Sequence, residues 1–178
     1  MSTIDLIVLG ILLREAQNAY EVVRFIREKE VHRVLKISEP AVFKSCRRLA
    51  EGGYLDGQTI RSEGVPDKVV YAVNAKGEQY FSELMKHFAA NFKPFYLDFN
   101  TVLWNIDQLK EEDALNSLRT LQEQLHEAYL WVSKHDEEVR SFLPFGPRQI
   151  VKQYTMTIGA LKQWIDEAVE DYSHKNTR

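Results

Sequence analysis

Three cationic side chains stand close together in the first half of the chain, at Lys44, Arg47 and Arg48. In a helix these positions project from one side, because residues three or four places apart share a face. A guanidinium group donates paired hydrogen bonds to phosphate oxygens or to guanine edges, whereas an ammonium group acts as a point charge. The spacing is therefore compatible with contact with a polyanion. The plain alternative is a solvated helix face, since most charge runs in proteins meet only water.

The charge of the chain is distributed unevenly along its length. The 178 residues carry a formal charge of −3, yet residues 24–48 contain eight Lys or Arg and only three Asp or Glu. Residues 89–178 contain 10 Lys or Arg against 14 Asp or Glu. A basic cluster on an otherwise acidic chain fits a polyanion contact, because each neutralised phosphate releases counterions.

Helices are predicted on both sides of this cluster. The apolar spacing predicts one helix over residues 4–15 and a second from an Asn18 cap to about residue 30. A third helix begins around Pro40, which suits a first helical turn, and ends at 52–53, where two glycines follow each other. Its inner side is predicted to consist of Val42, Cys46 and Leu49.

A hairpin and a fourth helix follow. Residues 69–73 alternate with the period of a strand, a weaker strand is predicted over 54–61, and the composition of 62–67 is that of a turn. Asn74 is the expected cap of the fourth helix. This order is typical of a winged helix-turn-helix, whose third helix enters a major groove while the hairpin reaches neighbouring phosphates.

The second half is predicted to be helical nearly throughout, so the fold class is mainly α with a small β-hairpin. We expect two domains, residues 1–90 and 91–178. The first helical stripe beyond the boundary is Phe92, Phe95, Phe99, Val102, Leu103, Ile106 and Leu109. An apolar loop is predicted at 142–147, before a last helix. Its apolar residues alternate at spacings of three and four, the pattern of helices packed within a chain or between chains: Tyr154, Ile158, Leu161, Ile165 and Ala168.

Several segments resemble the PadR family of bacterial transcriptional regulators. They are 5–12 (DLIVLGIL), 18–22 (NAYEV), 38–44 (SEPAVFK), 48–55 (RLAEGGYL) and 71–78 (YAVNAKGE). The length and the C-terminal helices resemble the longer subgroup of that family. The resemblance implies a winged helix-turn-helix that binds DNA, a helical C-terminal domain that forms a homodimer, and often an aromatic effector.

The candidate DNA-binding residues combine this resemblance with the charge pattern: Tyr20, Ser38, Ala41, Lys44, Arg47, Arg48, Arg61 and Lys68. Arg47 or Arg48 would read guanine edges and Lys44 a phosphate. Ser38 is an N-cap, a phosphate contact or both, because a helix N-terminus also binds anions. Tyr20 either reaches the DNA backbone or packs under the third helix. Arg61 and Lys68 are the main basic residues of a wing that is poor in them.

The C-terminal half offers candidates for two further sites. Aromatic residues at Tyr96, Phe99 and Trp104 could line a pocket for a planar effector, although an aromatic helix core is the plainer interpretation. The last-helix stripe at residues 154, 158, 161, 165 and 168 is the candidate dimerisation surface.

Other functions find little support in the sequence. The single cysteine, Cys46, forbids an internal disulfide and is expected to be buried. The histidine spacing matches no metal motif, and no catalytic or cofactor-binding motif is present, so we expect neither an enzyme nor a metalloprotein. No apolar run is long enough to span a membrane, and a cytoplasmic location is expected.

The leading hypothesis is a ligand-responsive regulator, a repressor by expectation, that binds an inverted-repeat operator in double-stranded DNA as a homodimer. The alternative is a protein-interaction or small-molecule-binding module that retains the winged helix without binding DNA.

Overall fold

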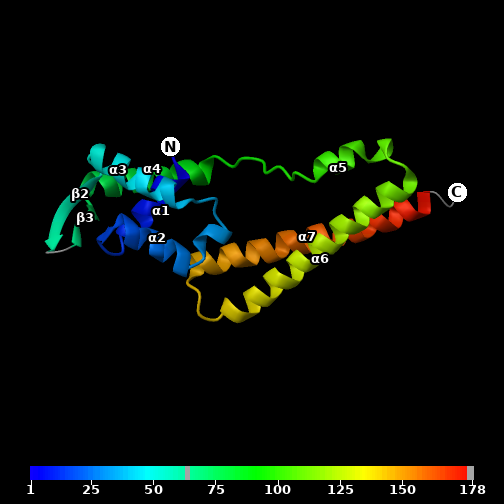
Figure 1. Ribbon diagram of the computed structural model, residues 1–178. Helices are drawn as coiled ribbons and strands as arrows, with labels where there is room; N and C mark the ends of the chain where they lie inside the picture. Colours follow the sequence, from blue (N-terminus) through cyan, green and yellow to red (C-terminus); the bar gives the residue numbers. More distant parts are fainter. Residues whose placement is uncertain (63–64, 176–178) are drawn as a thin grey trace. The chain divides into compact units, whose positions relative to one another are not determined.

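The computed structural model divides into two compact units, Met1–Pro94 and Phe95–Arg178. It describes the backbone of residues 1–62 and 65–175, and the side chains of these residues except 33, 61–62, 65–67 and 175. Figure 1 shows the elements along the chain, coloured from blue at the N-terminus to red at the C-terminus.

The first unit is a three-helix core with a hairpin and a fourth helix, which confirms the predicted winged helix-turn-helix. Its elements are α1 (Thr3–Leu12), β1 (Gln17–Asn18), α2 (Ala19–Glu28), η1 (Val31–Arg33), α3 (Glu39–Glu51), β2 (Leu55–Ser62), β3 (Val65–Val73) and α4 (Ala75–Ala90). The predicted inner residues of α3 (Val42, Cys46 and Leu49) are buried in the same core as Val8, Leu9 and Leu84. Burial of these side chains fixes α3 on the helices beneath it.

The predicted caps are present at both helix starts. Asn18 accepts from the backbone N–H of Glu21 at 3.0 Å, and the Glu21 carboxylate accepts from the N–H of Asn18 at 2.9 Å. This reciprocal pair is a capping box. Asn74 caps α4 in the same sense by accepting from the N–H of Gly77 at 3.0 Å.

The sheet has three strands in the order β1-β3-β2, and both pairings are antiparallel. β3 lies in the middle, with Leu55 opposite Val73 on one side and Gln17 opposite Tyr71 on the other. The predicted turn over 62–67 is too long, because β3 already begins at Val65. Residues 63 and 64, which complete that turn, lie outside the described residues.

The second unit is built on two long helices that run side by side in Figure 1. Its elements are α5 (Asn100–Asn105), η2 (Ile106–Gln108), α6 (Glu111–Val139) and α7 (Phe145–Lys175). Leu118 and Leu125 of α6 and Ile165 of α7 form its core. Of the described helices, none combines the length and apolarity that a membrane span requires.

Two helix predictions for this half are wrong. Residues 91–99 contain no helix, so Phe92 and Phe95 belong to no helical stripe. Pro94 contributes to this, because it lacks a backbone donor and restricts the residue before it. The loop predicted at 142–147 is shorter, since α7 begins at Phe145. Pro147 lies in its first turn, where a missing N–H costs nothing.

A single carboxylate ties α6 to α7. Asp166 of α7 accepts from Lys162 at 2.8 Å and from two α6 side chains, Gln122 at 2.7 Å and His126 at 2.6 Å. The hydrogen bonds from Lys162 and Gln122, with a smaller contribution from His126, hold the pKa of Asp166 well below its usual value of 3.8.

Replacing Asp166 with asparagine should therefore destabilise the second unit at neutral pH. A carboxyl whose pKa is lower in the folded than in the unfolded state stabilises the fold above its unfolded pKa. This stabilisation is lost as the pH falls through the folded value. Urea unfolding of both proteins between pH 7 and pH 3 should show a difference that shrinks below about pH 4. A difference that is the same at every pH would contradict this role.

The thiol of Cys46 should be chemically inert in the folded protein. Burial of the Cys46 side chain in the core beneath α3 raises the pKa of its thiol to about 11. The thiolate is the reactive form of cysteine. At pH 8 the native protein should react with a thiol reagent orders of magnitude more slowly than the urea-unfolded chain, as absorbance would show. Equal rates would mean that α3 opens readily.

Candidate nucleic-acid interface

The outward side of α3 carries two cations that have no ion-pair partner among the described residues, Lys44 and Arg47. Both side chains are exposed, whereas Val42, Cys46 and Leu49 on the other side are buried. A cation that is already exposed and unpaired can contact an incoming anion without losing a native ion pair. Two of the three cations predicted on the outward side of the third helix, Lys44 and Arg47, are thus accessible in the folded chain.

Arg48 corrects the expectation that all three cations project together. Its guanidinium forms an ion pair with Asp5 of α1, on the inner side of α3. The reason lies in helix geometry: Arg48 is three residues after Ser45, so the two side chains are neighbours. Ser45 is buried, and the long arginine side chain follows it towards α1.

Asp5 connects α1 to α3 through two bonds to its Oδ1 atom. Its side chain is only 5% exposed, and the hydroxyl of Ser45 donates to it at 2.5 Å. The second donor is the Arg48 guanidinium. A buried carboxylate with two donors from one helix fixes the rotation of that helix. Asp5 therefore helps to fix which residues of α3 face outward, a role that the sequence pattern does not indicate.

Replacing Asp5 with alanine should lower the free energy of unfolding by about 2 kcal/mol, the scale of a hydrogen bond to a charged group. The larger cost of breaking a fully buried pair does not apply, because Arg48 is half exposed and regains water. Urea unfolding followed by circular dichroism measures the change. Ser45→Ala is the matched control, because it removes only the neutral donor and should cost about half as much. An Asp5→Ala protein as stable as the wild type would show that this pair does not hold α3.

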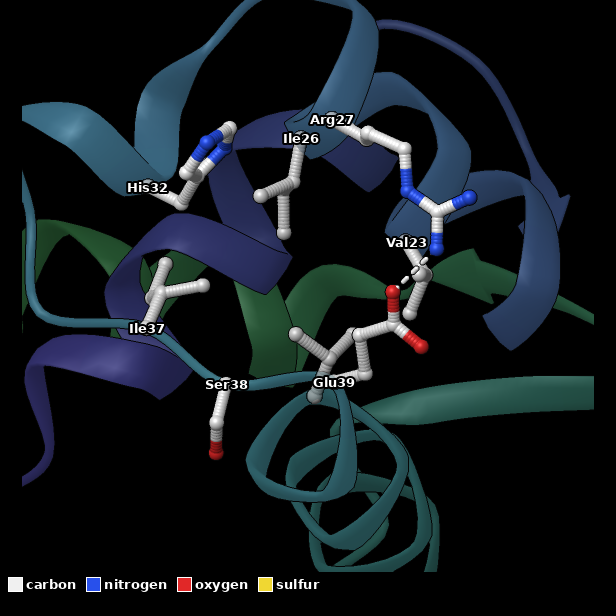
Figure 2. A pocket seen from close by; sticks show the side chains of 8 residues that line it. Val23, Ile26, Arg27, His32, Ile37, Ser38 and Glu39 are labelled. Atoms are coloured by element: carbon white, nitrogen blue, oxygen red, sulfur yellow. Dashed lines mark hydrogen bonds and ion pairs between the residues drawn. The ribbon is translucent and has the colours of Figure 1, made fainter.

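The first turn of α3 borders a hollow of about 290 Å³ between α2 and α3. Figure 2 shows Arg27 of α2 and Glu39 of α3 facing each other across its rim, where they form an ion pair. The apolar part of its lining includes Val23, Ile26 and Ile37.

Ser38 occupies the N-cap position of α3, but its side chain makes no capping hydrogen bond. In Figure 2 its hydroxyl points away from Arg27 and Glu39. Ala41, in the first turn, is half-buried. The hydroxyl of Ser38 is thus free to donate to an anion at this helix end.

Tyr20 packs against the third helix, which is one of its two predicted roles. Its ring meets Phe43 of α3 edge-on, with centroids 4.8 Å apart. The side chain nevertheless remains 73% exposed, which leaves its hydroxyl accessible.

The wing carries an exposed cation at Lys68 of β3. Arg61 belongs to β2, but its side chain lies outside the described ones. Of the two predicted wing contacts, only Lys68 can therefore be placed.

The base of the wing is bonded tightly to the start of α4. Lys76 donates to the carbonyl of Gly52 at 2.7 Å, and the Asn74 amide donates to the carbonyl of Gly53 at 3.1 Å and to Asp56 at 2.9 Å. A Cβ atom at Gly77 would lie 2.2 Å from the carbonyl oxygen of Tyr54. This position therefore requires glycine, and α4 rests directly on the backbone of Tyr54, just before β2.

The three effector candidates are not gathered into a pocket. Tyr96 is 89% and Trp104 88% exposed in the single chain, so neither is enclosed as a ligand contact would be. Phe99 stacks on Trp164 of α7, with centroids 5.9 Å apart. Its ring contributes to packing within the unit.

The dimerisation candidates divide into two groups. Ile165 is fully buried between α6 and α7, and Leu161 and Ala168 pack against the same core. The prediction is wrong for Ile165, because that side chain is covered by its own chain. Tyr154 and Ile158 retain exposed surface.

Neither protein-family models nor curated proteins match the sequence, but solved structures match its fold. Bacillus subtilis PadR in complex with operator DNA superposes with a TM-score of 0.81 at 12% identity, over 96% of this chain and 99% of that one. The same protein in complex with p-coumaric acid gives a TM-score of 0.80 at 12% identity, over 97% and 99%. A PadR-like transcriptional regulator from Bacillus cereus gives 0.72 at 14% identity, over 97% and 99%.

The chain therefore has the fold of the PadR-type transcriptional regulators over nearly its whole length. At the level of the fold, the comparison confirms the resemblance identified in the sequence.

Proposed function

We propose that this protein is a sequence-specific DNA-binding transcriptional regulator that acts as a homodimer on an inverted-repeat operator. The observation that carries the proposal is the outward side of α3, where Lys44 and Arg47 are exposed and unpaired with any described residue. These cations stand on the recognition helix of a fold shared with a protein solved on operator DNA. The third helix of a winged helix-turn-helix is the element that enters a major groove.

The proposed roles differ between the third helix, its first turn and the wing. Lys44 and Arg47 contact phosphate or guanine. Ser38, Ala41 and Tyr20 border the start of α3 and approach the DNA backbone there. Arg48 acts indirectly, as a positioning residue, because its guanidinium is bonded to Asp5. In the wing, Lys68 and Arg61 reach neighbouring phosphates.

Ligand control and dimerisation are further parts of the proposal. We assign residues 1–90 to DNA binding and 91–178 to dimerisation and effector response. Exposed aromatic residues such as Tyr96 and Trp104 supply apolar surface for a second copy. The p-coumaric acid complex of the Bacillus subtilis protein supports a small aromatic effector. We expect such an effector to release a repressor from its operator. Such an effector acts only if it binds one dimer arrangement better than the other. A regulator of this kind works at the chromosome, in the cytoplasm.

Selection of bound sequences from a random duplex DNA pool tests the proposal. We expect an inverted repeat whose half-sites lie about one helical turn, 34–36 Å, apart. Affinity for the selected duplex should fall by about three to five orders of magnitude between 50 and 200 mM salt if six to ten phosphates are contacted. A pool that shows no enrichment would overturn the proposal and favour an interaction module that keeps the winged helix for another purpose.

A further inference from the structure

The second unit contains a hollow of about 450 Å³ where the end of α6 and the start of α7 diverge. Asp136 and Arg140, one turn apart, come from α6. The α7 side is formed by residues that recur on one helical face: Arg148, Gln149, Lys152, Thr155 and Met156. The volume lies within the range of small-molecule sites, about 300–1,000 Å³.

The charge around this hollow is opposite to that of the surrounding chain. Residues 139–165 contain four Lys or Arg and no Asp or Glu, although residues 89–178 as a whole are acidic. Three of these four cations line the hollow. Among the described residues that line the hollow, Asp136 is the one acid, which leaves an excess of positive charge.

One of the three cations is already paired with a carboxylate, and the other two are not. Arg140 is bonded to Asp136, with 2.7 Å between its nitrogen and the carboxylate oxygen. Arg148 and Lys152 are exposed and form no ion pair with any residue of the described chain. Arg140 keeps further N–H donors beyond the one used by Asp136, since a guanidinium has five. A carboxylate in the hollow could therefore be bound by Arg148 and Lys152 with Arg140 as a third donor.

We propose that this hollow binds a small organic anion through its carboxylate, with Arg148 and Lys152 as the main contacts. Met156 supplies apolar surface for the body of the ligand, and the amide of Gln149 supplies a polar group. The hydroxyl of Thr155 donates within its own helix to Val151, so it can only accept from the ligand. Binding itself is independent of DNA. That the bound anion is the effector rests on the proposed function.

Calorimetric titration of the full chain without DNA, at low salt, tests the site. The probes are p-coumarate, benzoate and succinate, together with the neutral amide of p-coumarate and inorganic phosphate. We expect saturable binding of at least one carboxylate, weaker at higher salt because the attraction is screened. Arg148→Gln and Lys152→Gln should each weaken that binding about tenfold or more. Where p-coumarate binds, its amide should bind at least about tenfold more weakly.

Lys134→Gln is the matched control. It removes the same charge from α6, but Lys134 pairs with Glu138 and does not line the hollow. This variant should bind like the wild type.

Three results would overturn the proposal: no saturable binding of any carboxylate, equal binding of the amide and p-coumarate, or equal losses in Lys134→Gln and Arg148→Gln. Phosphate that binds as tightly as the best carboxylate would overturn the assignment of the ligand class. Since no DNA is present, none of these results bears on operator binding, which the selection experiment tests separately.

Discussion

Replacing Lys44 and Arg47 together with glutamine should weaken binding of the dimer to the selected operator about a thousandfold or more. Loss of one phosphate or base contact costs about 1–3 kcal/mol, and each subunit would lose two. The fold should be unaffected, because both side chains are exposed and have no ion pair among the described residues. Gel shift or fluorescence anisotropy at fixed salt measures the change.

The salt dependence separates the two kinds of contact. A lost phosphate contact reduces the slope of log affinity against log salt by about one, whereas a lost base contact relaxes the sequence preference. The control is a double variant, Lys86→Gln with Lys134→Gln, which removes the same charge from α4 and α6. If the control weakens binding as much as the α3 variant does, the affinity comes from overall charge and α3 is not the recognition helix.

Replacing Ile165 with aspartate should unfold the second unit instead of merely separating subunits. Ile165 is fully buried between α6 and α7. Removing a buried isoleucine costs about 2–5 kcal/mol, and an unpaired buried carboxylate adds several more. This sum approaches the whole stability of a typical domain. Circular dichroism should show a loss of helix at 25 °C.

Leu130→Asp is the matched substitution on an exposed site, because Leu130 of α6 is accessible in the single chain. It should keep the helix content of the wild type. If Ile165→Asp also stays fully helical but elutes as a smaller species on a sizing column, then Ile165 lies between subunits and not between α6 and α7 of one chain.

The first unit was predictable in outline because its signals are local. Helix periods, the Asn18 and Asn74 caps and the 52–53 glycines each act within a few residues of the chain. β1 was missed because a strand of two residues, Gln17–Asn18, has no period to detect. Its partner Tyr71 is far away in the sequence, so only the folded chain reveals the pairing.

The site was predictable only in part. The outward positions of Lys44 and Arg47 follow from helical periodicity, but the partner of Arg48 is 43 residues away, on α1. Spacings of three and four around Ile165 indicate a helix seam without saying whether the partner helix is in the same chain. In residues 91–99 apolar residues recur at helical spacing, yet one proline within them outweighs the pattern.

The glycine at position 77 has a mechanical consequence for regulation. Because a Cβ atom at position 77 would meet the carbonyl oxygen of Tyr54, and because Asn74 and Lys76 donate to the carbonyls of Gly53 and Gly52, the start of α4 is held against the backbone that leads into β2. If the proposed effector displaces α4, the displacement therefore reaches the wing and the core beneath α3 together, because Leu84 of α4 is buried with Val42, Cys46 and Leu49 of α3.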